Sequence, residues 1–485
     1  MKKHRVIFMP HAPILLKEIG AGKELEASGT LLAMERIGMI LKNEHPDTII
    51  YITPHGNSFT NGTCILWENE LSGDFGQFGH PDICFKKKTD MQLTEKINEK
   101  LEEEGIVTVL MDKKLSKSYG VLVHLDHGAM VPMYFVDKYI KDYEIVHITT
   151  GHTSLSEHYY IGKLINEVIK KTDKKILLIC SGDLSHALSD KGPYSYNSKG
   201  PAFDKLVKQS IEKKDPVSLV FIQDEFLEGA AQCGLRSFLV GFGTMDGMQY
   251  DSKVYSYEGP FGVGYLTGVL ESIGIEAFSL IQTIKERRKA YYNKRTSKED
   301  DYIKLARKSI EHYILTGKRI SEDEIKKSLS MSFVNHVGIL HGGCFVSIHK
   351  NKKLRGCIGT IAATSKNLID EIVYNSISAA TKDHRFDPIR EDELYDLEIK
   401  VDILYEREPI RSKSQLDVIQ YGVIVEKDGK RGLLLPNLEG IHSVEEQVSI
   451  AMQKAGIETE ENMKLFRFKV ERHEIIDVFE DEDDF

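Results

Sequence analysis

The segment KKILLICSGDLSH, residues 174–186, is the most informative part of the sequence for the fold of the first half of the chain. Residues 176–180 are all apolar, and an unbroken apolar run predicts a strand, here 175–180, that is buried on both faces of a sheet. Small and polar residues follow and end at His186, as expected for a loop. Comparable strands are predicted at residues 5–9, 48–52 and 145–149.

Amphipathic segments lie between these strands, for example at residues 163–171 and 202–212. Strands that alternate with helices are typical of an α/β domain with a central, mostly parallel sheet. We therefore predict such a domain over residues 1–275.

The composition changes after this domain. Residues 283–304 are dense in charge and poor in apolar side chains, which predicts a charged linker helix at 276–302. Its basic stretch, 285–294, is interpreted as a solvated helix face, with a nucleic-acid patch as the alternative.

A second domain is predicted at 303–478, ahead of a frayed acidic tail, EDEDDF. Its strands are expected at 343–349, 356–360, 397–404 and 422–426 and its helices near 303–316, 366–379 and 443–455, an order that indicates an α+β fold.

The composition of the whole chain excludes several classes of protein. The 485 residues carry a formal net charge of −10, which argues against a nucleic-acid partner, because phosphates require excess Lys and Arg. The apolar runs are far shorter than the roughly 20 residues of a membrane span, so no membrane association is expected. Six cysteines without a CxxC pair favour the reducing cytoplasm. The oligomeric state stays open, with a homo-oligomer among the alternatives.

Three histidines each follow a predicted strand. His11 lies after strand 5–9, His55 after strand 48–52 and His186 after strand 175–180. Ligands of open α/β sheets bind beyond the carboxyl ends of the strands, so these side chains are expected to meet in one cleft. Imidazole is the commonest metal ligand and titrates near neutral pH, so the cluster offers both metal ligands and an acid–base group. The alternative is that each histidine hydrogen-bonds within its own loop.

Four motifs carry a resemblance to a known family: MPHAP (9–13), TPHG (53–56), HLDHG (124–128) and SGDLSH (181–186). In this order they resemble the LigB-type class III extradiol dioxygenases and the related Memo proteins, over residues 1–275. The resemblance implies a small phenolic or catecholic substrate and a non-haem Fe(II) held by two histidines and a carboxylate. It makes His11 and His55 metal ligands and His186 the catalytic acid–base group. It also implies that His127 contacts the substrate or bound oxygen.

The third metal ligand is where this chain departs from the family pattern. The matching region, 224–238, reads DEFLEGAAQCGLRSF, and Memo proteins have a cysteine where Cys233 lies. We rank Cys233 first, Gln232 second and Glu228 third. A thiolate binds iron, zinc or copper, so Fe(II) is the first choice of cofactor, with zinc or copper as alternatives, and oxygen chemistry is expected to be altered.

Other residues near these motifs are candidates for the substrate side of the site. Asp183 is predicted to orient His186 or to cap a helix. Arg236 is predicted to hold an anionic substrate group, the alternative being an exposed surface arginine. The Gly- and Phe-rich segment at 73–82 is expected to form a wall of the cleft.

The second domain has its own motifs: LRGCIGT (354–360), DHRFDP (383–388) and GKRGLLLP (429–436). They resemble the AMMECR-type domain, which implies an α+β fold with an antiparallel sheet but no established activity. Such domains occur with Memo-like and radical SAM proteins, as in AmmeMemoRadiSam systems, which implies a radical SAM partner.

Cys357 is the candidate for chemistry in this domain. Arg355 is expected to lower its thiol pKa, and Cys344 is expected to face it across a hairpin as a redox partner. The alternative is a cysteine that fills a small pocket.

The sequence therefore predicts a metal-dependent, dioxygenase-like oxidoreductase fused to an AMMECR-type domain. The alternative function is a metal-binding or maturation module that does not cleave rings and works with a radical SAM partner.

Overall fold

The computed structural model of the protein describes residues 4–350, 353–405, 407–438 and 440–475. The chain divides into two compact units, residues 1–286 and 287–485, and the division lies within helix α11 (Leu280–Thr296). The predicted linker, 276–302, contains this helix. The predicted acidic tail lies outside the described residues. Among the described residues, no helix is both long and apolar enough to traverse a bilayer.

The first unit is built on an eight-stranded sheet whose order is β6-β3-β7-β2-β8-β1-β10-β9. The central strands β7, β2, β8 and β1 are parallel, whereas β10 and β9 are antiparallel, so the predicted mostly parallel sheet is confirmed. The four strands predicted from the sequence form within one residue of their expected ends. The strand bounds are β1 Arg5–Met9, β2 Thr48–Thr53, β3 Thr63–Leu66, β6 Thr108–Met111, β7 Glu144–Thr149, β8 Ile176–Ser181, β9 Met248–Glu258 and β10 Tyr265–Glu276.

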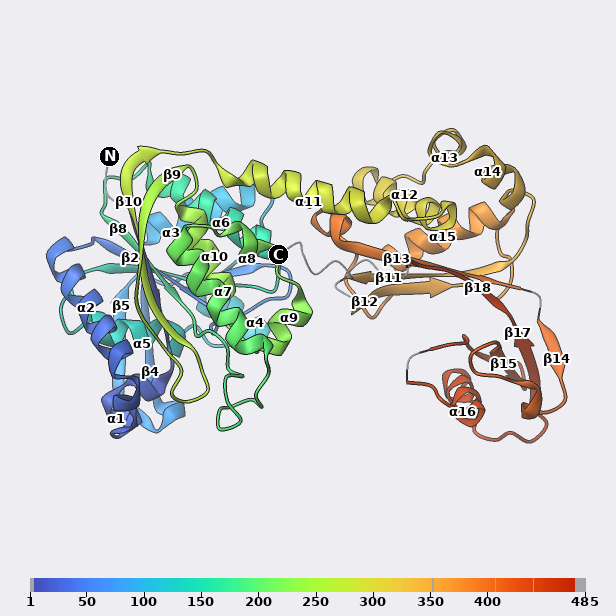
Figure 1. The fold of residues 1–485 in the computed structure, drawn as a ribbon, viewed down its shortest axis with the longest axis horizontal. Helices are drawn as coiled ribbons and strands as arrows, with labels where there is room; N and C mark the ends of the chain where they lie inside the picture. Colours follow the sequence, from blue (N-terminus) through green and yellow to red (C-terminus); the bar gives the residue numbers. More distant parts are fainter. Residues whose placement is uncertain (1–3, 351–352, 406, 439, 476–485) are drawn as a thin grey trace. The chain divides into compact units, whose positions relative to one another are not determined.

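Helices cover both faces of this sheet (Figure 1). In β2, Ile50 and Ile52 join one apolar core, and Ile49 and Tyr51 join the other, because neighbouring strand residues point to opposite faces. Both faces being apolar explains the unbroken apolar runs of the sequence. The helices are α2 Ser28–Glu44 and α5 His127–Val136 on one face, and α3 Met91–Glu103, α6 Leu155–Ile169, α7 Lys199–Lys213 and α10 Leu235–Thr244 on the other.

A two-stranded hairpin, β4–β5, stands apart from the main sheet. Its strands are joined by a short turn of 3-10 helix at Gly76–Phe78. The predicted cleft wall at 73–82 is the end of this hairpin. The bounds are β4 Glu70–Phe75 and β5 His80–Lys88, and the short helices of the unit are α1 Lys17–Gly20, α4 Lys113–Tyr119, α8 Val217–Val220 and α9 Asp224–Ala230.

The second unit contains two antiparallel four-stranded sheets, β12-β11-β13-β18 and β14-β17-β15-β16. Helices α12 and α15 share a core with the first sheet and α16 with the second, which confirms the predicted α+β fold. The strands are β11 Gly343–Lys350, β12 Lys353–Gly359, β13 Leu397–Leu404, β14 Glu408–Ile410, β15 Gly422–Lys427, β16 Lys430–Leu434, β17 Lys464–Phe468 and β18 Val470–His473. The helices are α12 Asp301–Thr316, α13 Glu322–Ser328, α14 Met331–Val337, α15 Leu368–Thr381 and α16 Val444–Ala455.

The predicted hairpin of the second unit forms between β11 and β12, but the predicted cysteine pair is wrong. The residue opposite Cys357 is Ser347, three residues from Cys344. An odd separation along a strand places Cys344 on the other face of the sheet. There its Sγ accepts a hydrogen bond from Asn375 of α15 at 3.3 Å, and all six cysteines are free thiols.

Candidate metal centre

Two of the predicted histidines meet at the carboxyl edge of the large sheet. His11 lies two residues beyond β1 and His55 two residues beyond β2, and in the sheet these strands are separated only by β8. Their ring centroids are 4.6 Å apart, so residues far apart in sequence are neighbours in space. The register of parallel strands brings this about, because their carboxyl ends lie at the same edge.

Cys233 completes the group. Its Sγ lies 3.4 Å from Nε2 of His11, and the ligand atoms of His11, His55 and Cys233 all lie within 4.8 Å of one another. Of the other two candidates, the amide oxygen of Gln232 accepts a hydrogen bond from Leu235 N, and Glu228 is exposed. The structure therefore groups Cys233, and neither alternative, with the histidines.

Close contact between two loops places the cysteine. A Cβ on Gly182, in the SGDLSH loop, would lie 2.3 Å from the Cα of Gly234. The two loops are also joined by Gly234 N, which donates to the Asp183 carbonyl at 2.9 Å. Only residues without side chains permit this approach, which brings Cys233 against His11.

The protonation states of the two histidines favour the binding of a metal cation. Burial, reinforced by the neighbouring imidazoles, holds the pKa of His11 well below its usual value, and burial lowers the pKa of His55 to about 4. Both rings are therefore neutral and have lone pairs for a metal. Burial also raises the pKa of the Cys233 thiol, so metal binding would displace its proton. Two imidazoles and a thiol fit iron, zinc or copper.

His186 lies close enough for its charge to lower the pKa values of His11 and His55. Its Nδ1 donates to the Ala231 carbonyl at 2.6 Å, which leaves the lone pair on Nε2. Burial lowers the pKa of His186 itself, although this hydrogen bond opposes the shift. A neutral ring with a fixed tautomer has the properties of a general base.

A buried carboxyl that sequence reasoning missed supports the loop of His186. Asp204, on α7, accepts a hydrogen bond from Ser185 N at 2.8 Å, and Ser185 Oγ donates to the Ala230 carbonyl at 2.7 Å. Burial raises the pKa of Asp204 to about 7. The sequence contains no signal for this contact, because α7 lies outside the motif.

Asp183 has a different position from the one predicted. Its carboxylate accepts a hydrogen bond from His11 N at 2.9 Å and lies 4.0 Å from Nε2 of the same residue. His186 is oriented by Ala231 instead, and the next helix of the described chain, α7, begins only at Lys199. The predictions that Asp183 orients His186 or caps a helix are therefore wrong. Asp183 holds the loop of His11, and burial raises its pKa to about 7.

His127 joins the cluster from the first position of α5. Its ring stacks on His55 with centroids 4.4 Å apart, and its centroid lies 5.5 Å from that of His11 and 5.6 Å from that of Phe78. Phe78 belongs to the predicted cleft wall, so this segment does border the cluster. His124, of the same motif, is exposed.

A buried acid–histidine pair, also missed from the sequence, lies behind His127. Asp126 accepts hydrogen bonds from His147 Nε2 at 2.6 Å and from Thr53 Oγ1 at 2.7 Å. Burial opposes its ionisation, but the His147 hydrogen bond brings the pKa of Asp126 below its ordinary value. The resulting negative charge acts on His55 and His127, where it offsets part of the lowering of their pKa values by burial.

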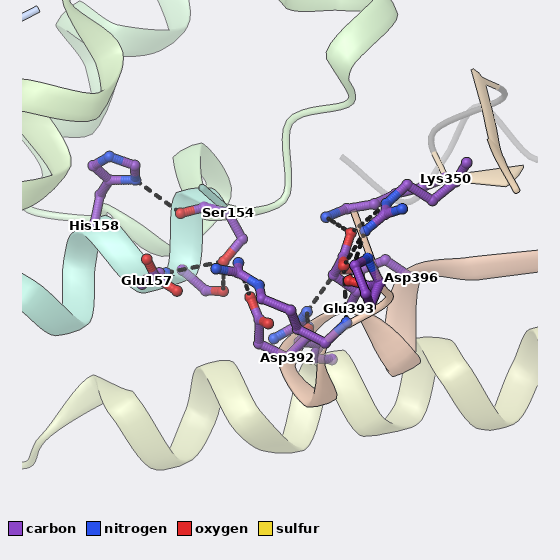
Figure 2. Close-up of polar contacts among 12 residues, drawn as sticks. Ser154, Glu157, His158, Lys350, Asp392, Glu393 and Asp396 are labelled. Carbon is purple, nitrogen blue, oxygen red and sulfur yellow. Dashed lines mark hydrogen bonds and ion pairs between the residues drawn. The ribbon is translucent and has the colours of Figure 1, made fainter. Parts of the chain in front are cut away.

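Arg236 lies in the first turn of α10 beside a different pair of histidines. Burial and, after it, the charge of Arg236 lower the pKa values of His152 and His158, and burial lowers the pKa of the guanidinium itself. Figure 2 shows His158, whose Nδ1 donates to the Ser154 carbonyl at 2.8 Å. Arg236 is thus partly buried rather than a surface arginine, and its predicted role in substrate binding stays a prediction.

In the second unit, Arg355 is engaged by Glu393. Its Nε and Nη2 donate to the two carboxylate oxygens at 3.1 and 3.0 Å, and Lys350 donates to the same carboxylate at 3.1 Å (Figure 2). Burial raises the pKa of the Cys357 thiol, so the predicted lowering by Arg355 is wrong.

The first unit is thus an open-sheet α/β protein with two histidines, a cysteine and an acid–base histidine at the carboxyl edge of its sheet. The chain belongs to the family described as the catalytic LigB subunit of aromatic ring-opening dioxygenase, whose family model matches residues 5–268, and it carries an AMMECR1 domain at residues 303–473. Both resemblances stated from the motifs are confirmed.

Two relatives and two solved structures are similar to parts or all of this chain. Protein CA_C1420 of Clostridium acetobutylicum is 39% identical over 96% of this chain and 98% of its own length. A Thermotoga maritima protein is 47% identical over 36% of this chain and 98% of its own. Among solved structures, uncharacterized protein JW3007 from Escherichia coli K12 covers 55% of this chain and 99% of its own, with 17% identity and a TM-score of 0.38. Uncharacterized protein PH0010 from Pyrococcus horikoshii covers 36% and 90%, with 28% identity and a TM-score of 0.32.

Proposed function

We propose that the first unit is a metal-dependent, dioxygenase-like enzyme that acts on a small phenolic or catecholic molecule. His11, His55 and Cys233 would hold the metal, with Fe(II) as the first choice and zinc or copper as alternatives. The observation that carries the proposal is the convergence of these three ligand atoms in a chain of the LigB family.

When bound, Fe(II) supplies Lewis acidity and reactivity with oxygen. The chain supplies the proton transfer and the positioning. His186 accepts the proton of the substrate hydroxyl at Nε2, because Nδ1 is held by the Ala231 carbonyl. His127 lies between His55 and Phe78, where it contacts the bound molecule. The buried acid Asp126 keeps the first turn of α5, and with it His127, in place by accepting from Gly128 N at 2.8 Å.

The experiment is anaerobic loading with Fe(II), followed by oxygen uptake in the presence of a panel of catechols. Uptake with a yellow, ring-opened product supports the enzyme. Stoichiometric iron without uptake for any catechol would reject it. Protein loaded with zinc is the matched control, since zinc occupies the same ligands but has no redox chemistry.

The chemical nature of the third metal ligand favours a second candidate function. A thiol replaces the carboxylate of ring-cleaving enzymes, and an AMMECR1 domain follows in the same chain. In this alternative the chain is a metal-binding or maturation module that works with a radical SAM partner. Metal binding without oxygen uptake, together with co-purification of a radical SAM protein from the same cell, would favour it over the enzyme.

A further inference from the structure

Two motifs of the second unit meet around the thiol of Cys357. The Ser347 hydroxyl donates to Cys357 Sγ at 3.2 Å from the neighbouring strand β11. Cys357 N donates to the carboxylate of Asp383 at 2.9 Å. Arg385 donates to the same carboxylate through Nε at 2.9 Å and Nη2 at 2.7 Å. Asp383 therefore links strand β12 to the guanidinium, which lies over the backbone of Cys357, with Nη2 3.4 Å from its carbonyl.

The cluster lies on the face of the sheet away from α15. Gly356 faces that helix so closely that a Cβ would lie 2.3 Å from the Ala379 carbonyl. Alternation along the strand turns the next side chain, Cys357, to the opposite face. Cys357 is half-buried at this face.

Two arginines near this strand differ in their exposure and in their hydrogen-bond partners. Arg355 has 18% of its side chain exposed and donates to Glu393 and to the carbonyls of Asp387 and Pro388. Arg385 has 49% of its side chain exposed, and its partners within the described residues are Asp383, the Cys357 carbonyl and the Phe386 ring, whose centroid lies 5.4 Å from its Cζ. Its Nη1 makes no hydrogen bond in that part of the chain. Arg355 is therefore structural, whereas Arg385 presents an oriented Nη1 that makes no hydrogen bond within the described residues.

We propose that Arg385 and Cys357 form an oxyanion-binding site with a thiol in reach, and that its ligand is a small carboxylate or phosphate compound. A guanidinium held by a buried carboxylate cannot swing away, so its Nη1 is preorganised to donate to an oxyanion. The anion would bind beside Sγ, with its neighbouring carbon within reach of the thiol. The charge of Arg385 also favours the thiolate, while burial, Asp383 and Asp402 favour the thiol.

Alkylation with two matched reagents tests the site in the full-length protein. Iodoacetate carries a carboxylate and iodoacetamide does not, but both react alike: the thiolate sulfur bonds to the CH₂ carbon and iodide leaves. The ratio of the two rates at Cys357 is compared with that at Cys84, an exposed cysteine of β5, by mass spectrometry of the peptides. We expect a ratio about three- to fivefold higher at Cys357, the range of an exposed charge pair.

Variants of Arg385 identify the cause of any preference of Cys357 for iodoacetate over iodoacetamide. Arg385→Ala should abolish it, and Arg385→Lys, which keeps the charge without the planar fork, should retain only part of it. Inorganic phosphate should slow alkylation of Cys357 in the natural protein and not in Arg385→Ala. Equal ratios at Cys357 and Cys84, or a preference that survives Arg385→Ala, would overturn the proposal. Circular dichroism of each variant ensures that only folded protein is compared.

Discussion

His11 and His55 lie in loops beyond β1 and β2, and their ring centroids are 4.6 Å apart. Side chains in such loops contribute to function more than to packing. Replacing either histidine should therefore weaken metal binding more than it lowers the free energy of unfolding.

We predict that His11→Ala and His55→Ala each weaken iron binding by more than about 100-fold, since even residues that only support metal ligands contribute 10- to 100-fold. The free energy of unfolding of the metal-free protein should fall by no more than about 2 kcal/mol. Metal analysis and urea unfolding measure the two effects. His124→Ala, at the exposed histidine of HLDHG, is the control, and full metal content in both variants would reject the centre.

His186→Ala should keep the metal but lower turnover by about 10²–10⁴-fold, the usual contribution of a general base. Because the pKa of His186 lies below 6.5, its ring stays neutral as the pH falls through that value, so activity should decline only at lower pH. A pH profile of the natural protein checks this shift. Partial rescue of the variant by added imidazole would support the role, and unchanged turnover would remove it.

The residues of the centre differ in how well the sequence predicts them. His11, His55 and His186 follow strands directly, so topology alone suggests that they meet. Cys233 depends on the Gly182–Gly234 contact and was ranked first only by family resemblance. Contacts such as Asp126–His147 and Asp204–Ser185 join separate elements, and no local pattern encodes them.

Among the elements, α6 and α10 pack against one another through glycines. A Cβ on Gly243 would lie 1.9 Å from the Tyr159 carbonyl, and one on Gly162 would lie 2.0 Å from the Val240 carbonyl. The backbones of the two helices therefore touch at these positions. This contact fixes α10, whose amino end follows Cys233.

Gly243→Ala should destabilise the first unit by about 2–3 kcal/mol, because the clash is with backbone and cannot be relieved by a side-chain rotation. Gly229→Ala is the matched control in α9, where the new Cβ would meet the side chains of Lys199 and Asn197. Equal urea midpoints for the two variants would contradict this interpretation.

Strands β1, β2, β7 and β8 of the first unit are predictable because each is an apolar run between helical segments, whereas β3, β6, β9 and β10 are not among the predicted strands. The second unit was harder. Its hairpin was foreseen, but the relation of Cys344 to Cys357 depends on register, and a shift of one residue exchanges the faces.

At the scale of the whole molecule, the two units have separate apolar cores. We therefore expect scanning calorimetry to resolve two transitions, of which only that of the first unit responds to metal. A cation at about 100 times its dissociation constant should raise that transition by roughly 5–10 °C. In His11→Ala, addition of the cation should shift neither transition. An equal shift of both transitions in the natural protein would contradict independent units.

The position of β1 in the sheet has a consequence for synthesis on the ribosome. This first strand lies between β8 and β10, so its two neighbours emerge roughly 170 and 260 residues after it. At about 5–20 residues per second, β1 waits many seconds for its second partner. During translation this apolar strand therefore lacks its sheet partners for that time, and a chaperone that binds it would keep it from aggregating.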